Sequence, residues 1–184
     1  MTFRPVSSNR RTVLSGLAAT IGIAVAGCLE AVDGGEQSGE SPDSPDPECT
    51  TDAHEEYGST EVRVTTPDGE ELGAVSAAIA DTPERKQLGL SDTESLSEEC
   101  AMLFVYDEVD DRTFAMPEMS FGIDIVFADD EGVITEIHHA PEPGPDEDGL
   151  EQTYPGRGQY VLETVYEWTE ERDVEEGDVL QFDQ

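Results

Sequence analysis

The chain has 184 residues, and its 44 acidic residues against 9 basic ones give a formal net charge of -35. This charge excludes most classes of nucleic-acid-binding protein, because an acidic surface repels phosphate, and it disfavours electrostatic docking on anionic membranes. The length suits one compact domain with accessory segments. Because Lys86 is the only lysine among so many carboxylates, we expect a halophilic protein whose acidic surface stays hydrated and whose self-repulsion is screened by salt.

Residues 1–27 are typical of a signal peptide for export. Arg10 and Arg11 resemble a twin-arginine motif, and the apolar run at residues 13–25 is shorter than the roughly 20 residues of a membrane-spanning helix. The run ends in Val25-Ala26-Gly27-Cys28, which resembles a lipoprotein processing box, so Cys28 is predicted to carry a lipid. The alternatives are a plain signal peptide with an incidental Cys28, or an unusually short anchor.

Residues 28–60 are predicted to form an acidic tether. Between residues 29 and 48 glycines and prolines alternate with seven acidic side chains, without any lysine, arginine or aromatic residue. Such a segment buries too little apolar surface to offset the entropy lost on ordering. The folded domain is expected at residues 61–184, held at the outer face of the cytoplasmic membrane.

The first predicted elements of the domain are a hairpin and a short helix. Strands at residues 61–65 and 72–80 flank the turn-forming Pro67-Asp68-Gly69. Asp81, Thr82 and Pro83 are typical of a helix start, and Gly89 of its end.

Short strands dominate the rest of the chain, and a sharp turn at residues 129–132 indicates a second hairpin. A proline- and glycine-rich loop is predicted at residues 140–158 and a helix at residues 163–172. The remaining predicted strands are at residues 102–106, 112–116, 123–128, 133–138, 159–162 and 179–182. This pattern predicts a mainly β fold: a single compact β-sandwich or barrel-like domain with one or two short helices.

Six short sequence blocks occur in a fixed order along the domain. They are Glu84-Arg85 with Gly89-Leu90, Met102-Leu103-Phe104-Val105, Phe114 with Met116, Asp124-Ile125-Val126-Phe127 with Gly132, Val161-Leu162-Glu163, and Gly177-Asp178-Val179. In order and spacing, residues 75–182 resemble the domain of unknown function 192 family, and the chain resembles its secreted lipoprotein branch in salt-loving archaea. The resemblance implies one mostly β domain, often exported, and no particular reaction.

Two positions depart from the pattern of that family. Ala115 stands where the family usually has tryptophan, which removes a large aromatic surface from any ligand site built on that ring. Ala101 stands where the family usually has glycine, a conservative change for packing.

Cys49 and Cys100 remain after lipidation of Cys28. In an exported protein two such thiols favour a disulfide. The rival interpretation is a reactive thiol, but no histidine or other base lies near either cysteine in sequence.

A soft-metal site is a second possibility. Met116, Met119 and one of His138 or His139, with Met102, offer thioether and imidazole ligands that suit Cu(I). Against this, Met102 and Met116 lie in apolar segments typical of a core. Adjacent histidines on a strand also face opposite ways, so at most one could join the site.

Asp124 interrupts an apolar strand, and Glu163 directly follows the apolar Val161-Leu162. A buried carboxylate needs a partner or a raised pKa, and Arg85 and Arg112 are the candidate partners in a chain with few cations. These four residues are predicted to line a small polar pocket or to form a structural ion network. The catalytic alternative takes Asp124 and Glu163 as a general acid/base pair.

The sequence therefore predicts an exported, lipid-anchored cell-envelope protein with a binding or accessory role, in preference to an enzyme. We expect no cofactor, no nucleic acid, a membrane contact through the lipid on Cys28, and a small ligand or an envelope component as partner. The rival functions are copper binding, and an envelope hydrolase that uses Asp124 and Glu163.

Overall fold

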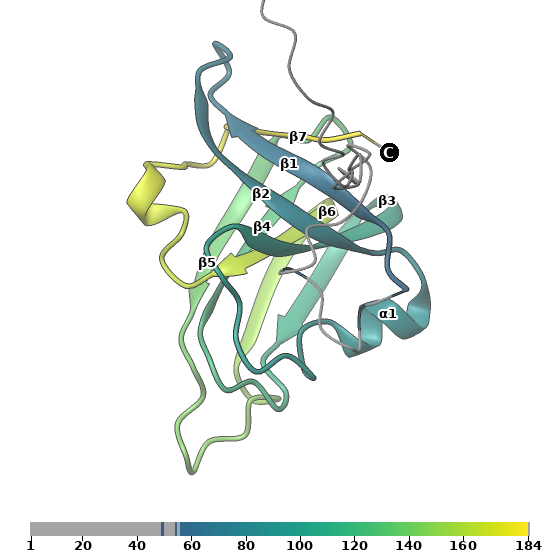
Figure 1. Ribbon diagram of the computed structural model, residues 1–184, viewed down its shortest axis with the longest axis vertical. Coiled ribbons are helices and arrows are strands. Elements are labelled where there is room, and N and C mark those ends of the chain that lie inside the picture. Colours follow the sequence, from purple (N-terminus) through teal and green to yellow (C-terminus); the bar gives the residue numbers. More distant parts are fainter. Residues whose placement is uncertain (1–48, 50–53, 55, 184) are drawn as a thin grey trace, which may run out of the picture. The chain divides into compact units, whose positions relative to one another are not determined.

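The computed structural model describes Cys49, His54 and residues 56–183, all within the unit that spans residues 39–184 (Figure 1). The predicted signal peptide, the lipidation site Cys28 and most of the predicted tether lie outside the described residues. None of the helices in the described part of the chain is long and apolar enough to cross a membrane.

Seven strands form one strongly curled sheet with the order β5-β4-β6-β3-β2-β1-β7 (Figure 1). A bridge between Val133 and Val179 brings β7 back to the start of β5, so that the sheet curls into a half-barrel. The mainly β, barrel-like prediction is therefore confirmed. The strands are β1 (Ser59–Thr65), β2 (Glu71–Ala80), β3 (Cys100–Ala115), β4 (Ile123–Ala128), β5 (Ile134–Ala140), β6 (Thr153–Val165) and β7 (Val179–Gln181).

The one parallel pair, β2 with β3, requires a crossover, and that crossover carries the helix α1 (Pro83–Leu88). The hydroxyl of Thr82 caps the helix by accepting from the backbone N–H of Arg85 at 3.3 Å. Gly89 ends the helix at φ 52°, a left-handed value that favours glycine. The predicted start and end of this helix are confirmed.

Three predictions about the strands, loop and helix were wrong. Residues 102–106 and 112–116 belong to one 16-residue strand, β3, and the loop after β5 ends at Gln152 because β6 starts at Thr153. No helix covers residues 163–172; β6 runs on to Val165, and only the 3₁₀ turn η2 (Glu170–Arg172) follows. The apolar spacing that suggested a helix includes Leu162 and Val165, which lie in β6, and Tyr166, which is 38% exposed beyond the strand.

Two apolar clusters lie on the two faces of the sheet, and successive residues of β6 alternate between them. We call the cluster around Leu162, Val126 and Trp168 the first core. The cluster around Val161, Met102, Phe104, Ile125 and Phe127 is the second core. This alternation decides which polar side chain of β6 meets which core.

Candidate functional site

The candidate site is a pocket of about 190 Å³ where the end of α1 faces β3, β4 and β6. Its wall combines apolar and polar side chains in about equal measure, and the apolar ones include Leu88 from the helix and Phe104, Phe114 and Ile123 from the strands. The polar side chains in the wall include Glu163 and the only lysine of the chain, Lys86. A recess where aromatic and aliphatic side chains surround placed polar groups is a usual form of a small-molecule site.

Glu163 lies at the end of the second core and is 5% exposed. It pairs across the sheet with Met102 on β3 and Ile125 on β4, so that its carboxyl group shares a face with these two apolar side chains. Among the described residues, none forms a hydrogen bond or ion pair with this carboxyl group. Burial away from water raises the pKa of Glu163 from 4.5 to about 8. At neutral pH the group is therefore mostly a neutral carboxylic acid, which can donate one hydrogen bond.

Tyr106 lies beside Glu163 in the pocket wall and carries two cations against its ring. The Nζ atom of Lys86 is 4.4 Å from the ring centroid, and the Cζ atom of Arg112 is 3.4 Å from it. Burial raises the pKa of Tyr106, with Arg112 acting to lower it and Glu163 to raise it further. The nearest positive charges thus contact the aromatic ring and leave the carboxyl group unpaired.

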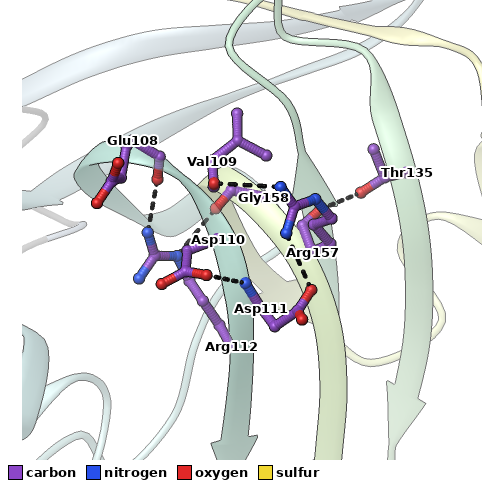
Figure 2. Close-up of polar contacts among 8 residues, drawn as sticks. All are labelled: Glu108, Val109, Asp110, Asp111, Arg112, Thr135, Arg157 and Gly158. Atoms are coloured by element: carbon purple, nitrogen blue, oxygen red, sulfur yellow. Dashed lines mark hydrogen bonds and ion pairs between the residues drawn. The ribbon is translucent and has the colours of Figure 1, made fainter.

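A bulge in β3 places Tyr106 at the pocket, and arginines hold this bulge (Figure 2). Between Val105 and Asp110 the chain advances five residues on β3 but only two on β6. Arg112 donates to the carbonyl of Gly158 at 2.9 Å and to that of Glu108 at 2.7 Å, which spans the bulge from both sides. Arg112 is therefore a positioning residue for Tyr106.

Arg157 holds the neighbouring part of the same bulge from β6 (Figure 2). It pairs with Asp111 at 3.2 Å, and its own backbone carbonyl accepts from the hydroxyl of Thr135 at 2.6 Å. The Arg157 side chain is 59% exposed, so this ion pair contributes less than the half-buried Arg112 contacts.

Asp124 is fully buried, but on the opposite face from Glu163. Its Oδ1 accepts from the Nδ1–H of His139 at 2.8 Å and from the backbone N–H of Glu167 at 3.0 Å. Its Oδ2 accepts from the backbone N–H of Thr169 at 2.9 Å and from the Thr169 hydroxyl at 2.6 Å. These donors pin the turn after β6, so that Asp124 has a structural role. The predicted acid/base pair of Asp124 and Glu163 is wrong, because adjacent sheet positions direct the two carboxyl groups to different cores.

Four residues were predicted to line a polar pocket, and of these Glu163 lines the pocket described above. Arg85 donates instead to Asp81 at 2.8 Å and to the carbonyl of Glu56 at 2.9 Å, and it lies over the ring of Tyr57. Neither Arg85 nor Arg112 pairs with Asp124 or Glu163. Lys86, which sequence reasoning missed, takes the predicted place of Arg85. Its signal was that it is the only lysine in the chain.

The proposed soft-metal ligands are engaged in packing and hydrogen bonding. Met116 is fully buried in the second core, and Met119 lies in the wall of the pocket. The Nε2 atom of His138 is 2.7 Å from the carbonyl of Pro155, and His139 bonds to Asp124. In the described part of the chain, no three His, Cys, Asp or Glu side chains gather as ligands for a metal ion.

The segment before β1 packs on the pocket region. Cys49 forms a disulfide with Cys100 at the start of β3, which is the pairing that the sequence favoured. The ring of His54 is buried, and its Nε2 lies 3.0 Å from the carbonyl of Gly89 in the pocket wall. Ordered packing thus includes residues of the segment 28–60 that the sequence assigned to the tether.

A second hollow, of about 400 Å³, lies between the β4–β5 turn and β7. Its acidic side chains, Asp130, Glu131 and Asp183, are all exposed on the surface. Exposed carboxylates are solvated and need no partner, and the lining of this hollow includes no buried carboxyl group like that of Glu163.

Two solved structures share this fold at low sequence identity. A protein from Sinorhizobium meliloti 1021, proposed to be a transcription regulator, is 23% identical with a TM-score of 0.61, over 68% of this chain and 95% of its own. A protein of unknown function from Novosphingobium aromaticivorans DSM 12444 is 23% identical with a TM-score of 0.56, over 66% of this chain and 83% of its own. At this identity the two structures establish the fold alone.

No curated protein is similar enough to count as a match. The family model described as "Uncharacterized ACR", the domain of unknown function 192, matches residues 63–182. That range begins inside β1 and includes all of the other six strands, together with Glu163, Lys86 and the bulge at Tyr106. The chain therefore belongs to the domain of unknown function 192 family.

Proposed function

We propose that this chain is an exported, lipid-anchored envelope protein whose β domain binds a small molecule in the pocket around Glu163. The observation that carries the binding role is the Glu163 carboxyl group, which is buried without a partner among the described residues and lines an open recess. Burying such a group costs free energy that an apolar side chain of similar size would not. A ligand that takes up its hydrogen bond would recover part of that cost.

The location rests on the first 28 residues. Paired arginines, a 13-residue apolar run and the tetrapeptide that ends in Cys28 follow one another in the order of a lipoprotein export signal. A disulfide at Cys49 and Cys100 supports the same location, because such bonds persist in oxidising compartments. High-salt surroundings remain part of the proposal on the strength of the net charge.

Binding is favoured over the two rival functions by the arrangement of the side chains. A hydrolase would need the two carboxyl groups at one substrate, yet Asp124 and Glu163 face different cores. A copper site would need Met116 to leave the second core and His138 to release the Pro155 carbonyl.

A fragment screen on the full chain tests the binding role. Small aromatic and aliphatic fragments should perturb the amide NMR signals of pocket residues such as Leu88, Phe104 and Phe114, and Glu163→Leu should change which fragments bind. Glu151→Gln, an exposed substitution in the β5–β6 loop, is the matched control and should leave the selection unchanged. A library that perturbs only other surfaces would refute the binding role.

Export and anchoring are tested in a host with twin-arginine transport. Replacing both Arg10 and Arg11 by lysine should retain the chain in the cytoplasm, whereas Arg4→Lys, outside the pair, should not. Cys28→Ser should release the protein to the medium or leave its signal uncleaved. An unchanged membrane fraction and an unchanged mass for Cys28→Ser would refute lipidation.

A further inference from the structure

We propose, on the basis of the binding role above, that the ligand is a small, largely apolar molecule with a carbonyl-type oxygen, to which the carboxyl group of Glu163 donates a hydrogen bond. The pocket geometry carries this inference. Glu163 comes from β6 with its neighbours Met102 and Ile125 on the same face, and its carboxyl group opens into the recess.

The size of the pocket limits the ligand. An apolar cavity of about 150 Å³ accommodates benzene, so the 190 Å³ recess has room for one six-membered ring with a short substituent. The ring would lie against aromatic and aliphatic side chains, of which Phe104 and Phe114 are already in edge-to-face contact at 5.0 Å. These side chains contact the ring of a ligand but do not distinguish between its polar substituents.

The protonation of Glu163 sets the polar part of the ligand. Burial raises the pKa of this group to about 8, so the carboxylic acid offers an O–H at neutral pH. Among the described residues, the titratable groups that line the pocket with Glu163 are Tyr106 from β3 and Lys86 from α1, while β4 contributes only apolar side chains. A buried donor without a partner favours a ligand that can accept a hydrogen bond from it over one that leaves the donor unpaired.

The local charge argues against a cationic ligand. Lys86 lies in the pocket wall, and Arg112 contacts the same Tyr106 ring at 3.4 Å. These two cations act at close range, whereas the acidic side chains of the outer surface are solvated and screened by salt. An ammonium group would also have to displace the proton of Glu163.

Three probes of matched shape test the inference on the full chain by NMR titration. Acetophenone presents a carbonyl oxygen, isopropylbenzene is its apolar counterpart, and 1-phenylethylamine is its cationic counterpart. At pH 6 acetophenone should bind roughly 3- to 10-fold more tightly than isopropylbenzene, the usual worth of one hydrogen bond. Between pH 6 and pH 9 its affinity should fall by up to the same factor, because Glu163 loses the proton that makes the hydrogen bond, while isopropylbenzene should show no such decrease.

Two variants distinguish the role of Glu163 as a hydrogen-bond donor from its contribution to the shape of the pocket. Glu163→Gln keeps a neutral donor, so acetophenone should still bind and its affinity should no longer depend on pH. Glu163→Leu should abolish the preference for acetophenone over isopropylbenzene. The control Glu151→Gln should reproduce the wild-type pH dependence.

The outcomes distinguish this inference from the proposed function. Equal affinity for acetophenone and isopropylbenzene would leave the pocket as a binding site but overturn the donor role of Glu163. Tighter binding of 1-phenylethylamine that strengthens with rising pH would overturn it in favour of a cationic ligand. Failure of all three probes to perturb the pocket at pH 6 would overturn both the inference and the binding role.

Discussion

Replacing Glu163 by glutamine should stabilise the protein at neutral and alkaline pH and remove one component of its pH dependence. The substitution keeps the shape and a hydrogen-bond donor, and it removes only the ability to ionise. In the unfolded chain Glu163 ionises near 4.5, whereas burial raises its pKa to about 8 in the folded state. Between these values the folded state holds a proton that the unfolded state has lost.

The sign and size of the effect follow from that difference. Because the folded state binds more protons, its stability falls as pH rises from 4.5 and levels off above 8. Each pH unit in this interval costs about 1.4 kcal/mol, so the full loss approaches roughly 5 kcal/mol and is roughly 3 kcal/mol at pH 7. Glu163→Gln should equal the wild type in stability near pH 4.5 and exceed it progressively up to pH 8.

Denaturant unfolding of the full chain with its disulfide intact, at constant high salt and at intervals from pH 5 to pH 9, measures this difference. The exposed Glu151→Gln removes a solvated carboxylate from the surface and serves as the control for a change in general charge repulsion alone. A gap between wild type and Glu163→Gln that does not vary with pH would refute the reasoning. So would a gap matched by the control.

Three further substitutions have definite expected effects on urea unfolding. Arg112→Ala should cost roughly 2–3 kcal/mol, because it leaves the carbonyls of Gly158 and Glu108 unpaired, whereas Arg157→Ala should cost less than about 1 kcal/mol. Asp124→Asn should cost roughly 2–4 kcal/mol, because its amide N–H₂ would meet donors in place of an acceptor; a cost below 1 kcal/mol would contradict the role assigned to it. Cys49→Ser should cost about 4 kcal/mol, as expected for a bond that closes a loop of 51 residues, and an unchanged midpoint would mean that the bond is absent in solution.

Local sequence patterns predicted the elements whose signals lie within a few residues. The strand at residues 123–128 and the helix capped by Gly89 have the expected bounds, since a short apolar run, a capping side chain and a glycine with positive φ are local properties. The helix predicted at residues 163–172 failed for a non-local reason. Leu162 and Val165 belong to β6, Tyr166 beyond the strand is exposed, and Thr169 is held by hydrogen bonds to Asp124, contacts that the spacing alone cannot reveal.

The sequence also predicted part of the candidate site, namely the part that depends on neighbouring residues in the chain. Apolar neighbours in the sequence marked Asp124 and Glu163 as at least half-buried, and both are in fact almost completely buried. Their surroundings were not predictable, because the partners of Asp124 include backbone N–H groups of Glu167 and Thr169, which any residue type would supply. Whether Lys86 or Arg85 faces the pocket depends on how the helix α1 is rotated about its axis. With only six residues, this helix has too short a sequence pattern to predict that rotation.

The disulfide also decides how the domain would respond to tension. A pull that arrives at Cys49 from its N-terminal side passes through sulfur to Cys100, at the start of β3 and next to β2. The β1–β2 hairpin, which follows Cys49 in the chain and lies between β3 and β7, is thereby bypassed and would not be pulled from the sheet first. Reduction of this one bond would redirect the same load into β1, so a change in redox state would convert a mechanically resistant attachment into one that unzips strand by strand.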